Sequence, residues 1–305
     1  MDKSRPHVDE LVHAFARAKT LAVLPPVVDV LRVAPPNPPE SVQAAFVGSS
    51  YVTAYAEAAS FVRVADEWLG RYRNRAGLAD SECIVDFGCG WGRISRLLLA
   101  HVQPSALYAL DVDVNMTALV GSTLPGVNAM TVAPYPPTVF RDGILDAVLA
   151  FSVFSHLSPA AHVAWAHEFG RLSAPGAMVF ITLLDVGFFG QIQSAKDAVA
   201  GGKADPFTVA LSGCLPDALE ARRQYESGKP VYAAVGGGGV RSADFYGWAA
   251  VPPEFVEQTW GRGGFDIVEW VPSGTLFPQA MVGLVKRRPR MSLTSKWASR
   301  WGRRS

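Results

Sequence analysis

Residues 84–93, with the sequence IVDFGCGWGR, decide the fold of this chain. A short apolar strand with an acid near its end, Asp86, is followed by three glycines and then by a helical stretch. Glycines in a turn from strand to helix let the backbone approach a ligand and leave amide groups at the start of the helix able to donate. The motif therefore predicts an α/β sheet that binds a small molecule at Gly88, Gly90 and Gly92.

The spacing of these glycines distinguishes between ligands. A nicotinamide dinucleotide site has the pattern GxGxxG, which would put the third glycine at position 93, where this chain has Arg93. Asp86, two residues before Gly88, suits a ligand with a positive amino group and would repel a pyrophosphate. The motif therefore argues against a nicotinamide oxidoreductase.

Strands and helices alternate from about residue 82 to residue 286. This alternation is typical of a mostly parallel sheet covered by helices on both faces, so we expect a Rossmann-like α/β fold. Seven strands are expected, at residues 83–87, 106–111, 127–132, 145–151, 177–184, 265–272 and 280–286.

Composition and charge exclude several classes of protein. The chain has 305 residues and is 49% hydrophobic, enough for a large core. Its net charge is +1, but residues 286–305 hold eight basic residues and no acid, which leaves a charge of −7 for the rest. A mildly acidic body argues against a nucleic-acid partner.

The cysteines and the apolar runs bear on location. The three cysteines form no CxxC motif and no His/Cys cluster, so neither a disulfide framework nor a metal site is expected. The beginning of the chain is acidic and no run of 18 apolar residues occurs, so we expect neither a secretory signal nor a membrane span. Together these features predict a cytoplasmic protein.

Two segments are expected to cover the domain of residues 81–287. Residues 1–80 have a near-helical spacing of apolar residues interrupted by prolines and are expected to form an N-terminal helical cap. Residues 186–248 form a connection far longer than usual between two strands and are expected to be a substrate lid. The expected elements of this lid are helices at 188–200 and 216–227 and a hairpin of 231–235 with 245–250, whose flexible tip is Gly236–Gly239.

The basic tail, residues 288–305, has a pattern of its own. Leu293, Trp297 and Trp301 recur every four residues among basic side chains, so a helix here would carry an indole stripe edged with positive charge. Such a helix can lie on an anionic membrane. The alternative is a solvated tail, or one docked on the body by its tryptophans.

A second ligand residue follows the glycine motif by about twenty positions. Asp111 ends the second expected strand, where a carboxylate can accept both hydroxyls of a ribose. Here the sequence resembles the class I S-adenosylmethionine-dependent methyltransferases, and more narrowly those of glycan and natural-product biosynthesis. The stretches that carry the resemblance are residues 85–93, 108–113, 142–156 (DGILDAVLAFSVFSH) and 171–176.

This resemblance implies S-adenosylmethionine as the cofactor. It places Asp86 and Gly88 near the methionine end and Asp111 at the ribose, and it extends the cofactor site to Gly90, Gly92, Arg93 and Val112. The family often has an acid or Asn after the third strand to meet the adenine amino group, whereas residues 133–135 (Ala-Pro-Tyr) offer only backbone and a ring. Asp113 and Asn115 either assist at the ribose or cap the next helix.

The acceptor side of the expected site has fewer indications. Methyl transfer is an in-line displacement, so positioning can supply most of the catalysis, but a hydroxyl acceptor must also lose its proton. His156 follows the fourth strand at the edge where such sheets bind ligands, which makes it the candidate base. The alternative is that His156 packs against the helix that begins near Ser158.

Three further residues are candidates for substrate contact. Asp185 ends the fifth strand and is a candidate to orient the substrate, while Tyr246 and Trp248 are candidates to close over it; ordinary strand packing is the alternative for the two aromatic residues. The sequence as a whole predicts a methyltransferase acting on a hydroxyl of a small molecule or saccharide. N-methylation and a homologue that binds the cofactor without catalysis are the alternatives.

Overall fold

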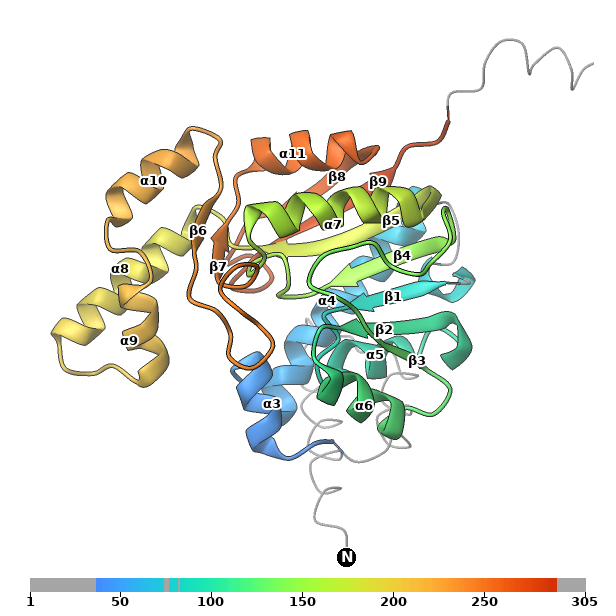
Figure 1. Ribbon diagram of the computed structural model, residues 1–305, viewed down its shortest axis with the longest axis horizontal. Coiled ribbons are helices and arrows are strands. Elements are labelled where there is room, and N and C mark those ends of the chain that lie inside the picture. The colour runs from blue at the N-terminus through green and yellow to red at the C-terminus, as the bar shows by residue number, and fades with distance from the viewer. Residues whose placement is uncertain (1–36, 74–76, 82, 290–305) are drawn as a thin grey trace, which may run out of the picture.

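The computed structural model describes residues 37–73, 77–81 and 83–289. Its centre is a seven-stranded sheet in the order β3-β2-β1-β4-β5-β9-β8, in which β9 runs in the opposite direction to the other six strands (Figure 1). The predicted Rossmann-like, mostly parallel α/β fold is confirmed. The strands are β1 (Ile84–Phe87), β2 (Leu107–Asp111), β3 (Asn128–Thr131), β4 (Leu145–Ala150), β5 (Ser173–Leu183), β8 (Phe265–Val271) and β9 (Ala280–Lys286).

Every predicted strand is present, but β5 begins four residues earlier than expected. Ser173 pairs with Leu145, and the register then shifts so that Met178 pairs with Ala147. The Pro-Gly pair at 175–176, which precedes the strand expected at 177–184, therefore lies inside this irregular part of β5.

Helices cover both faces of the sheet because its central strands are apolar on both sides; all four residues of β1, for example, are buried. One hydrophobic cluster joins the sheet to α4 (Tyr51–Arg73), α5 (Arg93–Leu98) and α6 (Val114–Thr123). The other joins it to α7 (Pro159–Leu172) and α11 (Pro253–Arg262).

The described part of the predicted N-terminal cap is built into the core. It contains α3 (Glu40–Val47), α4 and the short 3₁₀ helix η1 (Gly77–Asp80). The side chains of Tyr55, Phe61 and Leu69 on α4 are fully buried. Residues 1–36 of the predicted cap lie outside the described residues.

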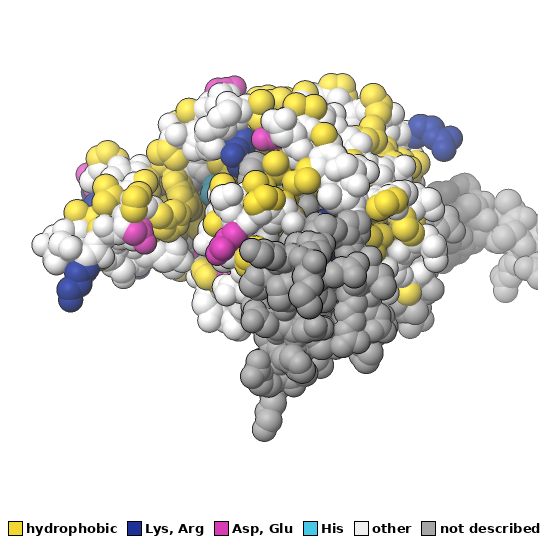
Figure 2. Space-filling model, turned by 90° about the horizontal axis from the view of Figure 1, so that it is seen from below, with side chains coloured by type: hydrophobic (Ala, Val, Ile, Leu, Met, Phe, Trp, Pro, Cys, Tyr) yellow, Lys and Arg dark blue, Asp and Glu magenta, His cyan; other side chains and the backbone are white. Residues whose placement is uncertain are grey.

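The predicted lid projects from one end of the sheet and has a small hydrophobic cluster of its own (Figure 1). The helix α9 (Pro206–Gly213) was not predicted. Its start nevertheless has two ordinary helix signals, because Asp205 is the N-cap, accepting from the Thr208 amide at 2.7 Å, and Pro206 follows it. Apolar side chains gather over the lid surface in Figure 2, and the exposed residues of α9 include Phe207 and Val209. The lid elements are α8 (Gly187–Ala200), α9 (Pro206–Gly213), α10 (Ala218–Glu226), β6 (Val231–Ala233) and β7 (Trp248–Ala250).

The glycine run between β6 and β7 has defined contacts. The Gly237 amide donates to the Arg241 carbonyl at 2.8 Å, and the Arg241 amide donates to the Gly238 carbonyl at 3.1 Å. A Cβ on Gly237 would lie only 2.6 Å from the ring of Tyr246, so the aromatic side chain requires glycine at this position. Close packing against the Tyr246 ring therefore explains the glycine at position 237.

None of the helices in the described part of the chain is long and apolar enough to cross a membrane. Only the first two residues of the predicted basic tail, 288 and 289, belong to that part. The membrane contact expected from Trp297 and Trp301 therefore concerns residues outside it and stays a prediction.

Two helical glycines provide a matched test of the packing. A Cβ on Gly170 of α7 would lie 2.4 Å from the carbonyl oxygen of Gly263 at the end of α11, whereas a Cβ on Gly190 of α8 would meet nothing within 4 Å. We expect Gly170→Ala to lower the free energy of unfolding by about 1–3 kcal/mol through overpacking. We expect Gly190→Ala to leave it unchanged or raise it by about 0.5–1 kcal/mol.

Chemical denaturation of the two variants beside the unchanged protein measures both effects. Equal stabilities for the two variants would contradict the close approach of α7 and α11.

Candidate functional site

The glycine turn is tied to the end of β2. The amides of Gly88 and Cys89 donate to the carbonyl of Leu110 at 2.8 and 3.0 Å. Gly88 has φ 72° and Gly90 has φ 50°, values in the left-handed region that favours glycine. A Cβ on Gly88 would also lie 2.4 Å from Cγ2 of Val153, in the loop after β4. The turn is thereby wedged between the end of β2 and the loop after β4 at the carboxyl edge of the sheet.

Asp111 and Gly90 lie together, as the sequence predicts. Oδ2 of Asp111 accepts from the Gly90 amide at 2.8 Å, and Oδ1 accepts from the Asp113 amide at 2.9 Å. Burial raises the pKa of Asp111, although these two amides partly oppose the shift. A carboxylate has about four acceptor positions, so Asp111 retains capacity for the hydroxyls of a ribose.

The neighbours of Asp111 have structural contacts. Asp113 accepts from the Asn115 amide at 2.9 Å and is the N-cap of α6, as the capping alternative expects. Val112 is partly buried and packs against the hydrophobic cluster of α7 and α11.

Asp86 is buried and bound to the first turns of α5. Its Oδ2 accepts from both the amide and the hydroxyl of Ser95, at 2.9 and 2.6 Å. Burial raises the pKa of this carboxyl to about 7, against the effect of the two hydrogen bonds. Asp86 thus fixes the helix that follows the glycines, and contact with a cofactor stays a prediction for it.

Arg93 points to the N-terminal segment. Its Nη1 donates to the carbonyl of Ala54 at 2.9 Å and lies 3.6 Å from a carboxylate oxygen of Glu57, both on α4. Its Cζ lies 5.0 Å from the centre of the Phe151 ring in the loop after β4. The described contacts of Arg93 therefore join α4 to the site, and its contact with the cofactor stays a prediction.

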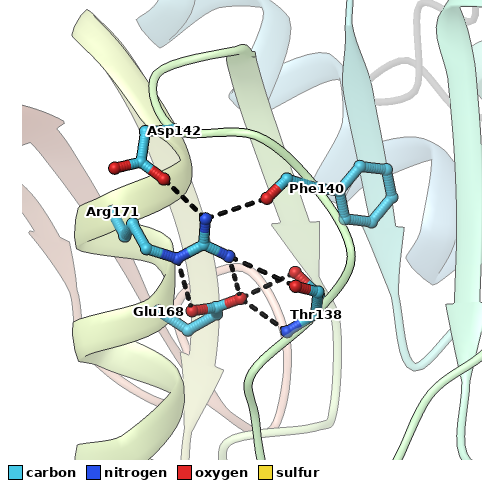
Figure 3. A network of polar contacts seen from close by, with 5 residues as sticks. All are labelled: Thr138, Phe140, Asp142, Glu168 and Arg171. Atoms are coloured by element: carbon cyan, nitrogen blue, oxygen red, sulfur yellow. Dashed lines mark hydrogen bonds and ion pairs between the residues drawn. The ribbon is translucent and has the colours of Figure 1, made fainter.

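The loop between β3 and β4 is held to α7 by a polar network that the sequence analysis missed (Figure 3). Arg171 contacts Glu168 through two nitrogens, at 2.6 and 3.0 Å, and also donates to the carbonyl of Phe140 at 2.8 Å. Glu168 in turn accepts from the amide and hydroxyl of Thr138, at 2.7 and 2.6 Å. Burial raises the pKa of Glu168, but these hydrogen bonds outweigh it and the net shift is downward.

The same loop begins with residues 133–135, the segment expected near adenine. The carbonyl of Pro134 accepts from Nε1 of Trp165 at 2.9 Å, and the hydroxyl of Tyr135 donates to the carbonyl of Asp244 in the lid at 3.5 Å. The lid, this loop and α7 are therefore connected on this side of the site.

His156 lies in the loop after β4 and faces the lid. Its Nδ1 is 2.7 Å from the carbonyl oxygen of Gly247. Because a carbonyl only accepts, Nδ1 carries the proton and Nε2 carries the lone pair in the neutral ring. Burial lowers the pKa of His156 to about 4, so the ring is neutral at physiological pH.

Two aromatic residues of the lid pack on this imidazole, and their predicted closure over a substrate stays a prediction. Tyr246 stacks on His156 with ring centres 4.8 Å apart and planes 9° apart, and Trp248 lies at 5.2 Å. Trp248 also stacks on Phe188 of α8 and contacts Phe207 of α9. The structure thus brings His156, Tyr246 and Trp248 into one aromatic group.

Asp185 has different partners. Its Oδ1 accepts from the Ser273 hydroxyl and the Gly187 amide, at 2.6 and 2.9 Å, and its Oδ2 accepts from the Ser273 amide at 3.0 Å. These bonds fix the start of α8 to the turn between β8 and β9. In the described structure Asp185 is therefore a support of the lid, and its predicted contact with the substrate stays a prediction.

Ser152, immediately after β4, is a residue that no sequence pattern indicated. It is not a glycine, yet its φ is 59°. Its amide donates to Oγ1 of Thr182, whose hydroxyl donates to Gln279, and the Gln279 amide donates back to the Ser152 hydroxyl, at 2.7, 2.6 and 2.9 Å. Backbone held in this region concentrates at functional sites. The network fixes the loop that carries His156.

The described residues contain no group of three or more His, Cys, Asp or Glu side chains that could hold a metal ion. The described site is therefore built from the glycine turn, the carboxylate of Asp111 and the aromatic group of His156.

Residues 84–176 match the model of a family described as a methyltransferase domain. This range contains the glycine turn, Asp111 and His156. The match confirms the resemblance to methyltransferases, which implies S-adenosylmethionine as the cofactor. No curated protein matches the sequence.

Three similar solved structures are methyltransferases. An amino pentose methyltransferase from Micromonospora echinaspora, involved in calicheamicin biosynthesis, is 16% identical, with 79% of this chain and 93% of that chain covered and a TM-score of 0.46. The 1,6-didemethyltoxoflavin-N1-methyltransferase from Burkholderia thailandensis is 14% identical, with 83% and 94% covered and a TM-score of 0.44. The CurJ carbon methyltransferase is 14% identical, with 94% and 72% covered and a TM-score of 0.48. They include nitrogen and carbon methyltransferases, so the acceptor atom does not follow from the likeness.

Proposed function

We propose that this protein transfers the methyl group of S-adenosylmethionine to a hydroxyl of a small molecule or saccharide. The observation that carries the proposal is the state of His156, which is neutral and has Nδ1 bound to the Gly247 carbonyl. A neutral imidazole with the lone pair on Nε2 can accept a hydroxyl proton.

The residues at the carboxyl edge of the sheet fit the cofactor. Asp111 has acceptor positions left for the ribose hydroxyls, and Gly90, bound to it at 2.8 Å, would line the same pocket. Gly88 and Gly92 permit the close approach of backbone that the ligand needs. Asp86 would serve the methionine end from behind this turn, and Val112 would add an apolar contact beside Asp111.

Arg93 would act on the cofactor pocket through the helix that it holds. Its hydrogen bond to Ala54 keeps α4 against the glycine turn, and Tyr55 of the same helix packs edge-on against Trp91 of that turn, with ring centres 5.6 Å apart. The described part of the N-terminal cap would therefore close the cofactor side of the site, while the lid closes the acceptor side.

The chain's contribution to the reaction is positioning, exclusion of water and one proton transfer. When bound, S-adenosylmethionine supplies an electrophilic methyl group on a sulfonium, and displacement in line requires only that the acceptor oxygen be aligned with it. Nε2 of His156 would accept the proton that leaves the hydroxyl. Tyr246 and Trp248 would hold the imidazole in place and exclude water around it.

N-methylation is the second candidate, and the lowered pKa of His156 is the observation that favours it. A pKa near 4 makes the imidazole a weak proton acceptor. A neutral amine is already nucleophilic and needs only an acceptor for its N–H, which the same Nε2 would provide.

Asp111→Ala tests the cofactor site. Loss of charge-assisted hydrogen bonds to the ribose should weaken S-adenosylmethionine binding about 10- to 100-fold, as expected when such bonds are removed. Titration calorimetry measures the change. Asp113→Ala is the matched control, because Asp113 caps α6 and its loss should lower stability by about 1 kcal/mol without changing affinity.

NADH should bind neither variant nor the unchanged protein. An Asp111→Ala protein that is folded and binds S-adenosylmethionine with unchanged affinity would remove the ribose assignment.

His156→Ala tests the base. With an acceptor found by mass spectrometry of a metabolite extract and deuteromethyl-labelled cofactor, turnover should fall about 10²- to 10⁴-fold while cofactor affinity stays nearly intact. His167→Ala is the control, because His167 is exposed on α7 and should be replaceable without effect.

The pH profile of the unchanged enzyme adds a second measurement. Protonation of His156 removes its lone pair, so its contribution to kcat/KM should be lost only as the pH falls through about 4. A limb at the ordinary histidine pKa of about 6.5 that disappears in His156→Ala would show that burial does not lower this pKa. Unchanged turnover of His156→Ala would assign the proton transfer to another residue or support an amine acceptor.

A further inference from the structure

The lid helix α9 exposes an apolar surface. None of its 8 residues, Pro206–Gly213, is charged, and Phe207 and Val209 are 60% and 51% exposed. The next helix, α10, has the composition of an ordinary surface helix, with exposed ion pairs such as that of Arg222 with Glu226. Within the lid, α9 therefore differs from α10 in presenting apolar side chains to water.

The surface of α9 is continuous with the candidate acceptor site. The ring of Phe207 lies edge-on to Trp248 with ring centres 5.7 Å apart, and Trp248 lies 5.2 Å from the imidazole of His156. Tyr246 stacks on the same imidazole at 4.8 Å. The aromatic rings thus form a series that begins at an exposed phenylalanine and reaches the candidate base.

Another exposed apolar residue lies beside Tyr246. The Tyr246 carbonyl accepts from the amide of Gly236 at 3.0 Å, and the residue before this glycine, Val235, is 54% exposed. Figure 2 shows apolar side chains of the lid reaching its junction with the body of the molecule. Phe207, Val209 and Val235 thus form an apolar border on the lid side of the acceptor site.

This apolar border fits an aromatic ring system better than it fits a saccharide. A saccharide has hydroxyls on most of its carbons, and each hydroxyl that leaves water needs a hydrogen-bond partner. The side chains of Phe207, Val209 and Val235 offer no such partner. An aromatic acceptor gains from stacking on rings whose centres lie about 4.5–7 Å from its own.

The proton transfer indicates the same class of acceptor. Burial lowers the pKa of His156 to about 4, so its Nε2 is a weak proton acceptor. A phenol such as the tyrosine side chain has a pKa of about 10, against about 15.7 for water, which an aliphatic alcohol resembles. The equilibrium constant for giving a proton to this imidazole is therefore about 10⁵-fold larger for a phenol than for an aliphatic alcohol.

We propose that the methyl acceptor is a phenol whose aromatic ring system lies along Trp248 and Phe207 while its hydroxyl lies at Nε2 of His156. The inference rests on the proposed function, since it takes a hydroxyl to be the methylated group. The phenol oxygen forms a bond to the methyl carbon as the bond from that carbon to sulfur breaks. The electron pair of the broken bond stays on the sulfur of S-adenosylhomocysteine, and the phenol proton passes to Nε2 of His156.

The test uses the full chain and a metabolite extract divided on a reversed-phase column into a retained, apolar pool and an unretained, polar pool. Each pool is incubated with deuteromethyl-labelled S-adenosylmethionine, and labelled products are identified by mass spectrometry and NMR. We expect an aryl methyl ether from the retained pool. Label confined to the unretained pool, or a labelled aliphatic ether from either pool, would overturn the inference and leave the proposed function standing. Label on nitrogen or carbon would overturn both.

Variants then assign the binding of the acceptor to the apolar border. Phe207→Ala should raise KM for the labelled acceptor about 5- to 30-fold and leave kcat nearly unchanged, because it removes a stacking contact remote from the reacting atoms. Phe207→Tyr should retain a normal KM, because it keeps the ring. Leu219→Ala is the matched control, because Leu219 is a lid residue on α10 that is 73% exposed, and its loss should change neither constant.

Three results with the variants would overturn the inference. The first is an unchanged KM in Phe207→Ala, and the second is an equal rise of KM in Leu219→Ala. The third is that Phe207→Ala changes the oligomeric state, measured by sedimentation, or loses cosedimentation with phosphatidylcholine vesicles. The apolar border would then belong to a contact with a second copy of the chain or with a lipid surface.

Failure of methyl transfer is distinguishable from failure of the inference. If neither pool is labelled, the proposed function is wrong, and the apolar border is judged by ultrafiltration of the protein, loaded with S-adenosylhomocysteine, with each pool. Aromatic hydroxy compounds retained by the unchanged protein and lost from Phe207→Ala would support the inferred site. Retention of polar compounds only, or of none, would overturn it.

Discussion

The docking of the lid on the loop after β4 centres on a pair of hydrogen bonds between His156 and Gly247. Two backbone bonds flank this pair, from the Ser158 amide to the Phe245 carbonyl at 2.8 Å and from the Ala249 amide to the Ser155 carbonyl at 2.9 Å. The amide of Gly247 donates to the His156 carbonyl at 2.8 Å, and the Gly247 carbonyl accepts from Nδ1 of His156 at 2.7 Å. The second bond sets the tautomer of the imidazole. Tyr246 and Trp248, which precede and follow Gly247 in the chain, pack against the same imidazole ring. A lid that docked elsewhere would remove the aromatic group and the orientation of the base together.

The cofactor half of the site depends on topology instead. The carboxyl ends of β1, β2 and β4 meet at one edge because the strands are parallel neighbours, and the Leu110 carbonyl then receives the amides of Gly88 and Cys89. Asp111 closes this arrangement by accepting from Gly90. In the proposed function the sheet would supply the cofactor side and the less regular lid the acceptor side, where specificity can vary without disturbing the sheet.

The sequence predicts the proximity of the glycine turn and Asp111 because its determinants are local. The strand residues of β1, the glycines that follow and Asp111 at the end of the next strand are separated by short, regular intervals, and the fold brings them together without further information. The seven strands and the two longest lid helices are predicted for the same reason: apolar periodicity is a property of neighbouring residues.

The acceptor half depends on contacts between residues far apart in the sequence, which no local pattern reveals. Asp185 binds Ser273, 88 residues later, through both of its carboxylate oxygens, a contact that no local pattern indicates. The left-handed Ser152 is stabilised by Thr182 and Gln279, which are distant in the sequence. The helix α9 was missed although its signal is local: Asp205 as N-cap followed by Pro206 marks its start in the sequence. The N-terminal 36 residues and the basic tail, outside the described chain, stay predictions.

The state of His156 is the claim on which the proposed chemistry rests most directly. Nitrogen-15 NMR of histidine-labelled protein, with the resonances of His156 assigned by comparison with His156→Ala, measures that state across a pH titration. The structure predicts a neutral ring with the proton on Nδ1 that persists to below pH 5, because burial lowers the pKa to about 4. A ring that carries its proton on Nε2, or that is protonated on both nitrogens near neutral pH, would contradict the account.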